Sequence, residues 1–129
     1  MGEILKILLV EDNLLNQRIV MFSLKKYNHE VIIANNGLEA VERFKEGEYD
    51  VILMDIMMPV MDGLEATVKI REVEKMKNTE RRTPIIALTA NTMDNDRNTC
   101  LAHGMDEFMS KPFDIDKLKS IFKELSITD

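Results

Sequence analysis

The sequence predicts an α/β protein of five strand-helix units, with a parallel sheet in the order 2-1-3-4-5 and helices on both of its faces. Two observations predict this fold class. Short apolar runs alternate along the chain with amphipathic stretches, and most of these runs lack the in-out alternation of a half-exposed strand. For five such units, right-handed crossovers make this order the compact arrangement.

The predicted strands are the five apolar runs, each bounded by polar or turn-forming residues. They span residues 4–10, 30–34, 51–54, 85–88 and 107–109. Continuous apolar sequence of this length is expected where both faces of a parallel sheet are covered by helices. In the order 2-1-3-4-5 the first and third strands are neighbours, and a ligand crevice is expected at their carboxyl ends.

The predicted helices fill the intervals between the strands, at residues 14–27, 37–47, 63–76, 92–103 and 114–125. Each begins at a residue whose side chain can accept a hydrogen bond from the first turn. Gly104 follows the fourth helix, where a glycine commonly ends a helix in the left-handed conformation. The predicted capping residues are Asn13, Asn36, Asp62, Asn91 and Asp114.

Composition limits the classes of function. A chain of 129 residues forms one domain, residues 1–129 with a core from about 4 to 125. The net charge of −6 argues against a direct nucleic-acid binder. Cys100 is the only cysteine, which excludes an internal disulfide and favours a reducing, cytoplasmic location. No apolar run approaches the length of a signal peptide or a membrane span, so no membrane contact is expected.

Three carboxylates follow neighbouring strands of the predicted sheet. Glu11 and Asp12 come after the first strand, and Asp55 comes after the third. Like charges about 4 Å apart repel by roughly 4 kcal/mol per pair at an effective dielectric near 20, so such a cluster needs a cation, a raised pKa, or both. A hard divalent ion such as Mg²⁺ is the simplest remedy.

The fourth and fifth strands also deliver polar groups to this edge. Thr89 follows the run PIIAL, and Lys111 follows EFMS. Each residue alone has an ordinary explanation, because threonine is common in turns and lysine is usually solvated. An acid pair, a single aspartate, a hydroxyl and an ammonium at four of five strand ends together indicate a functional site.

Four segments that carry these residues, LLVEDN, DVILMDIMMPVMDG, IIALTAN and GMDEFMSKPF, resemble the receiver domains of two-component response regulators. The resemblance extends from about Ile4 to Leu125 and implies a flavodoxin-like, doubly wound fold. The segments EDNLLNQ and ALTANTMDNDRNTCLAHGMDEFMSKP are similar to the corresponding segments of receivers attached to hybrid sensor histidine kinases. Such receivers exchange phosphate with a sensor histidine kinase or a histidine phosphotransfer domain.

The resemblance implies a role for each acidic residue. Asp55 would be the phosphoacceptor and would take a phosphoryl group from a phosphohistidine. Asp12 and Asp55 would bind Mg²⁺ directly, with the backbone carbonyl of Met57 as a third ligand and Glu11 acting through water. Mg²⁺ is therefore the expected cofactor.

The resemblance also implies a conformational switch. Thr89 and Lys111 would contact the phosphoryl oxygens, and Phe108 would be the switch aromatic. A cis peptide between Lys111 and Pro112 would aim the ammonium inward, and X-Pro is the bond type in which cis is least costly. A phosphorylation-dependent homodimer would use the face of the fourth helix, fifth strand and fifth helix.

The first predicted helix suggests a docking surface for the phosphate-donating partner. Periodicity of about 100° per residue predicts one buried face, comprising Ile19, Val20, Ser23, Leu24 and Tyr27. The opposite face is unusually apolar, and a helical bundle that bears a phosphohistidine is expected to dock there. The predicted docking residues are Leu14, Leu15, Arg18, Met21 and Phe22.

Two other classes of function remain to be compared. A flavin mononucleotide electron carrier of this architecture needs a hydroxyl- or glycine-rich phosphate loop, whereas this chain has Glu11, Asp12 and Asn13 there. An aspartyl-phosphate phosphatase needs a second acid two residues after its nucleophile, whereas Met57 stands two residues after Asp55. A degenerate receiver that only binds proteins is disfavoured because no residue of the site is missing.

Catalysis by the domain itself is expected to be limited to slow loss of its own phosphate. The thioether of Met57 cannot position an attacking water, and Asn91 is the only nearby alternative. The sequence ends shortly after the last predicted helix, so we expect a receiver without a DNA-binding output domain, either on its own or as a piece of a hybrid sensor histidine kinase.

Overall fold

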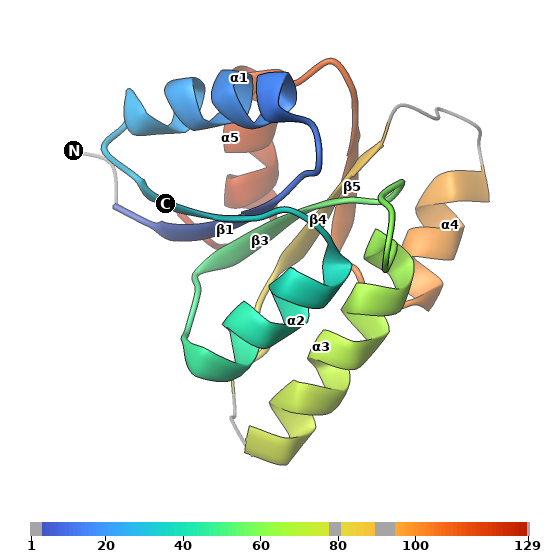
Figure 1. The fold of residues 1–129 in the computed structure, drawn as a ribbon. Coiled ribbons are helices and arrows are strands. Elements are labelled where there is room, and N and C mark those ends of the chain that lie inside the picture. The colour runs from blue at the N-terminus through green and yellow to red at the C-terminus, as the bar shows by residue number, and fades with distance from the viewer. Residues whose placement is uncertain (1–3, 78–80, 90–94, 129) are drawn as a thin grey trace.

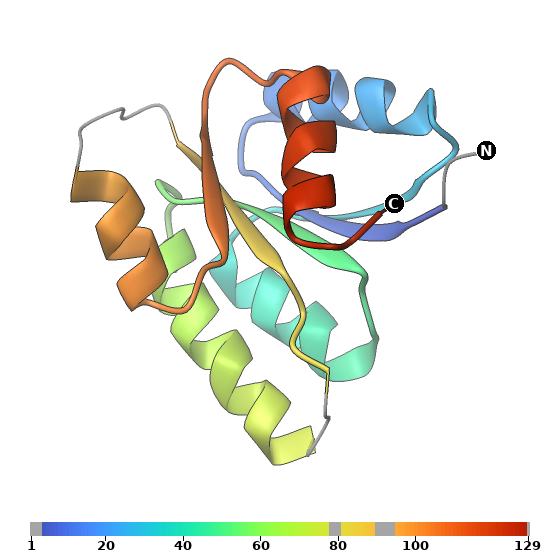
Figure 2. The same ribbon diagram turned by 180° about the vertical axis from the view of Figure 1, so that it is seen from behind.

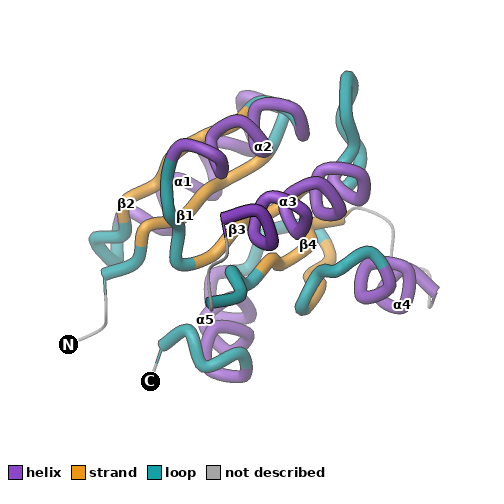
Figure 3. Tube along the Cα trace, turned by 90° about the horizontal axis from the view of Figure 1, so that it is seen from below, coloured by secondary structure: helices purple, strands orange, loops and turns teal. Residues whose placement is uncertain are grey.

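A computed structural model of the chain describes residues 4–77, 81–89 and 95–128. These residues form a five-stranded parallel sheet in the order β2-β1-β3-β4-β5, which confirms the predicted topology. Seen from below, β2, β1, β3 and β4 follow one another across the sheet (Figure 3). The strands are β1 (Lys6–Val10), β2 (Glu30–Ala34), β3 (Val51–Asp55), β4 (Ile85–Thr89) and β5 (Glu107–Ser110).

The helices cover both faces of the sheet. One face carries α1 and α5, and the other carries α2, α3 and α4 (Figures 1 and 2). Within the described ranges, no helix combines the length and apolar character needed to cross a bilayer. The helices are α1 (Leu14–Lys25), α2 (Gly37–Glu46), α3 (Gly63–Lys77), α4 (Asn95–Ala102) and α5 (Ile115–Glu124).

The core consists of two apolar clusters, one on each face of the sheet. Alternate residues of the central strands enter opposite clusters, because successive side chains of a strand point to opposite faces. In β3, Val51 and Leu53 pack with residues of α1 and α5, whereas Ile52 and Met54 pack with residues of α2 and α3. The uninterrupted apolar runs therefore reflect burial on both sides, as predicted.

Helix starts follow the predicted capping chemistry. The Asn13 side chain accepts a hydrogen bond from the Asn16 N–H at 3.0 Å, and Asn36 accepts one from Glu39 at 2.9 Å. Asp62 and Asp114 cap α3 and α5 in the same way. Gly104, shortly after α4, has a positive φ of 108°, a conformation that glycine adopts without steric cost.

Several element boundaries differ from the prediction. β1 begins at Lys6 and not at Ile4, which is exposed. α1 ends at Lys25, and the chain then turns through Asn28 with a φ of 64°. The predicted cap Asn91 and the predicted helix start at Thr92 lie outside the described residues.

The carboxyl ends of the central strands are brought together by their register. Val10 pairs with Met54, so the next residues along β1 and β3 are Glu11 and Asp55. The loop after β3 returns tightly, with the Gly63 N–H donating to the carbonyl of Ile56 at 2.9 Å. A Cβ at Gly63 would collide with the main-chain oxygen of Asp55, so this return requires glycine.

The opposite end of the sheet is held by an arginine on α3. The guanidinium of Arg71 donates to the Gly104 carbonyl at 2.9 Å and to the Thr83 carbonyl at 2.8 Å, and it pairs with Asp106 at 2.8 Å. Arg82 also pairs with Asp106, at 2.9 Å. These contacts join α3 to the amino ends of β4 and β5.

Candidate functional site

The three predicted acidic residues lie together at the carboxyl edge of the sheet. Glu11, Asp12 and Asp55 each offer a carboxylate oxygen, and these oxygens all lie within 4.8 Å of one another. Glu11 and Asp55 are buried, whereas Asp12 is exposed. The site therefore opens to solvent on the side of Asp12.

Lys111 supplies a positive charge to this cluster. Its Nζ donates to Glu11 Oε1 and to Asp55 Oδ2, both at 3.1 Å. Burial lowers the pKa of Lys111, but its hydrogen bonds and charge interactions with the two carboxylates outweigh burial and raise it overall. The ammonium therefore remains charged and bridges the two buried acids.

The connection after β5 directs Lys111 toward the acids. The Lys111 N–H donates to the carbonyl of Thr89 at 2.7 Å, which ties this connection to the end of β4. The peptide between Lys111 and Pro112 is cis, as the sequence resemblance implied. Lys111 thus reaches the same edge of the sheet as Thr89.

Thr89 and Phe108 occupy neighbouring strands. Thr89 is the last residue of β4 and is buried. Phe108 lies in β5 and pairs in register with Ala87, and its partly buried ring packs against the cluster beneath α2 and α3. The aromatic ring is therefore neither fully in the core nor fully in solvent.

Met57 lies in the loop after β3, and its side chain is largely exposed. Its neighbour Ile56 donates a backbone hydrogen bond to the Leu88 carbonyl at 3.2 Å. This contact fixes the start of the loop beside β4. The position suits a main-chain ligand more than a side-chain one, because a thioether is a poor ligand for hard cations.

A polar residue that the sequence reading overlooked also reaches the site. Gln17 in α1 is buried, and its Nε2 donates to the main-chain oxygen of Glu11 at 2.6 Å. The signal was its spacing, because residues 17, 20 and 24 fall on one helical face and form the buried stripe of α1.

The exposed face of α1 only partly matches the prediction. Ile19 and Tyr27 were expected inside but are 48% and 42% exposed. Met21 was expected on the outer face but is partly buried. The other four predicted docking residues are exposed: Leu14, Leu15, Arg18 and Phe22.

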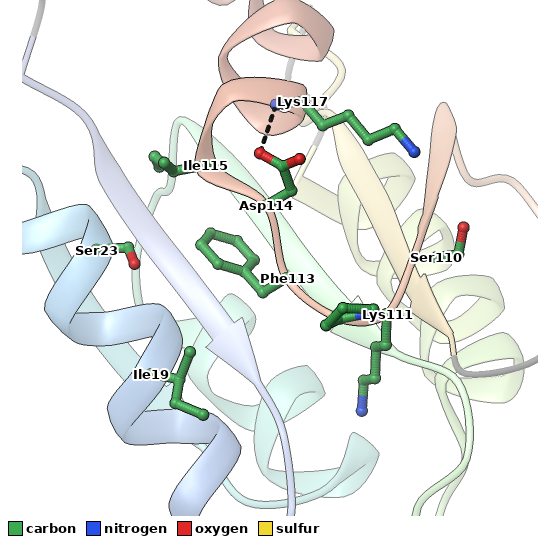
Figure 4. A pocket seen from close by; sticks show the side chains of 9 residues that line it. Ile19, Ser23, Ser110, Lys111, Phe113, Asp114, Ile115 and Lys117 are labelled. Carbon is green, nitrogen blue, oxygen red and sulfur yellow. Dashed lines mark hydrogen bonds between the residues drawn. The ribbon is translucent and has the colours of Figure 1, made fainter.

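A groove runs between α1 and the connection from β5 to α5. It has a volume of about 500 Å³, and Ile19 and Ser23 extend into it from α1 toward the ring of Phe113 (Figure 4). Lys111 and Pro112 also line the groove. The exposed face of α1 is thus continuous, through Ile19, with a hollow that borders the bridging lysine.

The donor set of the cluster fits a hard divalent cation. It consists only of carboxylate oxygens, which Mg²⁺ prefers over nitrogen or sulfur. The same acids oppose a phosphate-bearing flavin, since the turn after β1 presents negative charge. The flavin-carrier alternative is therefore not favoured, and neither is the phosphatase alternative.

Comparison with known proteins agrees with this geometry. Residues 7–123 match the family described as the response regulator receiver domain. Hybrid signal transduction histidine kinase K of Dictyostelium discoideum is 42% identical over 118 residues, which cover 89% of this chain and 10% of that protein. Histidine kinase 5 of Arabidopsis thaliana is 39% identical over 92% of this chain and 15% of its own length. The chain thus corresponds to a small part of these relatives.

Solved structures give the same result. The receiver domain of a sensor histidine kinase from Pseudomonas aeruginosa, with a magnesium ion in its active-site cleft, is 40% identical, with a TM-score of 0.82 and coverage of 95% of this chain and 97% of that one. A co-crystal structure from Saccharomyces cerevisiae, of a histidine phosphotransfer protein and the receiver domain of its downstream response regulator, matches at 34% identity and a TM-score of 0.86, covering 96% and 90%. Sequence, fold and site together place this chain in the family of response regulator receiver domains.

Proposed function

We propose that this receiver domain accepts a phosphoryl group from a phosphohistidine on Asp55, in a site that also holds Mg²⁺. The observation that carries the proposal is the arrangement around Asp55. Its carboxylate lies within 4.8 Å of two further acids and 3.1 Å from the Lys111 ammonium. A buried aspartate with a cation-binding cluster on one side and a fixed positive charge on the other suits attack on phosphorus.

The residues of this chain divide the work of holding the cation. Asp12 and Asp55 would bind Mg²⁺ directly, together with the main-chain oxygen of Met57, and Glu11 would act through water. When bound, Mg²⁺ would neutralise charge on the transferring phosphoryl oxygens. Receiver domains from Pseudomonas aeruginosa and Arabidopsis thaliana have been crystallised with this ion, and their similarity supports the assignment.

The transfer itself exchanges one bond to phosphorus for another. An Asp55 carboxylate oxygen forms the new P–O bond while the P–N bond of the phosphohistidine breaks. The electron pair of that bond stays on the imidazole nitrogen, and because the other ring nitrogen carries a proton, the imidazole leaves as the neutral group. Lys111 stabilises the oxygens of the phosphoryl group, because its ammonium already faces Asp55.

The phosphorylated state would be read through Thr89 and Phe108. An acyl phosphate on Asp55 adds about two negative charges and strong acceptors, to which the Thr89 hydroxyl can donate. Movement of Thr89 toward Asp55 would leave space beside β5, into which the partly buried Phe108 ring can turn. The output is a change in the surface formed by α4, β5 and α5, which is also the proposed homodimer face.

The partner would dock on the exposed apolar face of α1. Leu14, Leu15 and Phe22 are exposed large hydrophobic residues there, with Arg18 among them. A histidine phosphotransfer domain or a histidine kinase would bring its phosphohistidine to the adjacent acids. The co-crystallised yeast pair and the similarity to hybrid histidine kinases support this choice of partner, and such a relay would operate in the cytoplasm.

The first experiment locates the phosphate. The protein is incubated with Mg²⁺ and a small acyl phosphate or phosphoramidate donor, and the modified residue is identified by mass spectrometry. We expect one phosphoryl group on Asp55, none in Asp55→Asn, and an unchanged yield in the exposed control Asp116→Asn. Modification of another side chain in the wild-type protein would refute the assignment.

The second experiment tests the docking face. Leu14→Glu combined with Phe22→Glu should abolish transfer from a phosphorylated histidine phosphotransfer domain, because two charges would replace exposed apolar contacts. The same variant should still react with the small donor. Met76→Glu, at an exposed position near the far end of α3, is the matched control. Equal loss with both donors would argue against docking on α1.

The stability of the phosphorylated form is a separate expectation. Because the thioether of Met57 offers no hydrogen bond to an attacking water, we expect slow loss of phosphate from Asp55. The half-life is measured by following the phosphorylated mass after removal of the donor. A half-life of only seconds in Mg²⁺ would contradict this reasoning.

A further inference from the structure

The buried amide of Gln17 has no role in the function proposed so far. Gln17 lies in α1, 5% exposed, beneath the turn that carries two of the acids. We propose that Gln17 is a positioning residue that fixes this turn and thereby sets the affinity of the acidic cluster for Mg²⁺. The inference rests on the Mg²⁺ site proposed above.

Both hydrogens of the Gln17 amide nitrogen are engaged. Nε2 donates to the main-chain oxygen of Glu11 at 2.6 Å and to Asn35 Oδ1 at 2.9 Å. A buried donor that loses its acceptors bears a desolvation penalty, so these two contacts hold the side chain in one orientation. The amide therefore tethers the end of β1 to the end of β2.

The contact with Glu11 determines how the acid pair is presented. The peptide between Glu11 and Asp12 is planar, so fixing the Glu11 carbonyl also fixes the direction in which the chain enters Asp12. The carboxylate of Glu11 is held separately, by the N–H of Asn13 at 3.1 Å. Gln17 thus orients the peptide that joins the two acids, while Asn13 orients one of the carboxylates.

A second layer of contacts fixes the orientation of Asn35. Its main-chain N–H and its Nδ2 both donate to Glu39 Oε1 at 3.2 Å. With its nitrogen engaged by Glu39, the amide of Asn35 presents its oxygen to Gln17. A chain of hydrogen bonds therefore runs from Glu39 in α2, through Asn35 and Gln17, to the main chain of Glu11.

The effect on metal binding is expected to be moderate. Loss of an outer-shell partner of a metal ligand commonly weakens affinity by about 10- to 100-fold. Gln17 acts on the main chain between the acids and not on a carboxylate, so we expect a loss of about tenfold, at the lower end of that range.

The test compares two substitutions on the buried stripe of α1. Gln17→Met keeps the length of the side chain but removes both donors, whereas Val20→Ala removes only apolar contacts. The Kd for Mg²⁺ is measured by isothermal titration calorimetry, at a temperature at which circular dichroism shows each variant to be folded. We expect Kd to rise about tenfold in Gln17→Met and to stay within about twofold of wild type in Val20→Ala.

A double variant without change in net charge tests whether an acceptor at residue 35 is enough to hold Gln17. In the double variant Asn35→Asp, Glu39→Gln, residue 35 still offers Gln17 an acceptor, and the donor and acceptor between residues 35 and 39 are reversed. Net charge is unchanged, so we expect a Kd within about twofold of wild type. A single Asn35→Ala should weaken binding, by less than Gln17→Met.

The outcomes separate this inference from the metal site itself. Failure of the wild-type protein to bind Mg²⁺ would refute the proposed site and the role of Gln17 with it. Wild-type affinity in Gln17→Met, or an equal loss in Val20→Ala, would refute the positioning role alone and leave the metal site intact.

Discussion

Replacement of Lys111 by methionine should destabilise the protein much more without Mg²⁺ than with it. The Lys111 ammonium lies 3.1 Å from Glu11 Oε1 and 3.1 Å from Asp55 Oδ2. At an effective dielectric near 20, each contact corresponds to about 5 kcal/mol of Coulomb attraction, opposed by the cost of desolvating the charges. Removing one partner of a buried pair typically costs about 3–5 kcal/mol.

We expect the lower end of that range. The Lys111 side chain is 25% exposed, so water partly replaces the lost ammonium, and the free energy of unfolding should fall by about 3 kcal/mol in a chelator. With Mg²⁺ bound, the same acids have another cation, and the loss should shrink to about 1 kcal/mol or less. The test is therefore whether Mg²⁺ raises the free energy of unfolding more in Lys111→Met than in the wild-type protein.

Urea unfolding measures the loss of stability with and without Mg²⁺. It is followed by far-ultraviolet circular dichroism, because the chain contains no tryptophan whose fluorescence could report unfolding. Lys117→Met, an exposed lysine lining the same groove, should change stability by less than about 0.5 kcal/mol. The pKa of Lys111 is raised, so its contribution is complete below the ordinary value of 10.5 and is lost as pH rises through the higher, folded-state value. An equal loss of stability with and without Mg²⁺ would refute the bridging role.

Three further predictions concern the scaffold. Arg71→Met should lower the free energy of unfolding by about 3 kcal/mol, and Arg82→Met should lower it by less than about 1 kcal/mol. Both side chains bind the Gly104 carbonyl and Asp106, but they are 13% and 55% exposed. Equal losses in urea unfolding would contradict this. Burial lowers the pKa of His29, whose Nδ1 accepts a backbone N–H, so the free energy of unfolding should fall as pH drops through 6.5. The variant His29→Gln should show less of this pH dependence when unfolding midpoints are compared between about pH 7.5 and about pH 5.5. Gly63→Ala should cost about 2 kcal/mol and reduce phosphorylation of Asp55 by the small donor, because the added Cβ displaces that residue's main chain; normal phosphorylation would show that the loop can adjust.

The sheet and its polar edge follow from local features of the sequence. Apolar runs identify strands buried on both faces, and residues such as Glu11, Asp55 and Lys111 follow those runs directly. Because the carboxyl ends of parallel strands share one edge, the positions of these residues in the chain were enough to predict that their side chains lie together. Capping asparagines and aspartates gave most helix starts for the same reason, since the cap interaction spans only three residues.

The face of α1 was harder to predict because apolar residues surround most of this helix. Periodicity could not distinguish the buried Val20 from the exposed Ile19, since both are apolar and were predicted on the same face. The spacing of Gln17 from Val20 and Leu24 puts it on their helical face, but its hydrogen-bond partners Glu11 and Asn35 follow β1 and β2, and the sequence of the helix alone does not reveal them. The contacts of Arg71 were not predicted for a similar reason, because this residue binds Gly104 and Asp106, which lie more than thirty positions further along the chain.

The two outermost strands of the sheet, β2 and β5, have five and four residues. An unpaired strand margin can template hydrogen bonding with a foreign chain, and short length and charge both oppose this. Each of these strands begins with a glutamate, Glu30 on β2 and Glu107 on β5, and Glu107 also forms an ion pair with Arg97. The glutamates at both margins therefore disfavour the addition of a further strand.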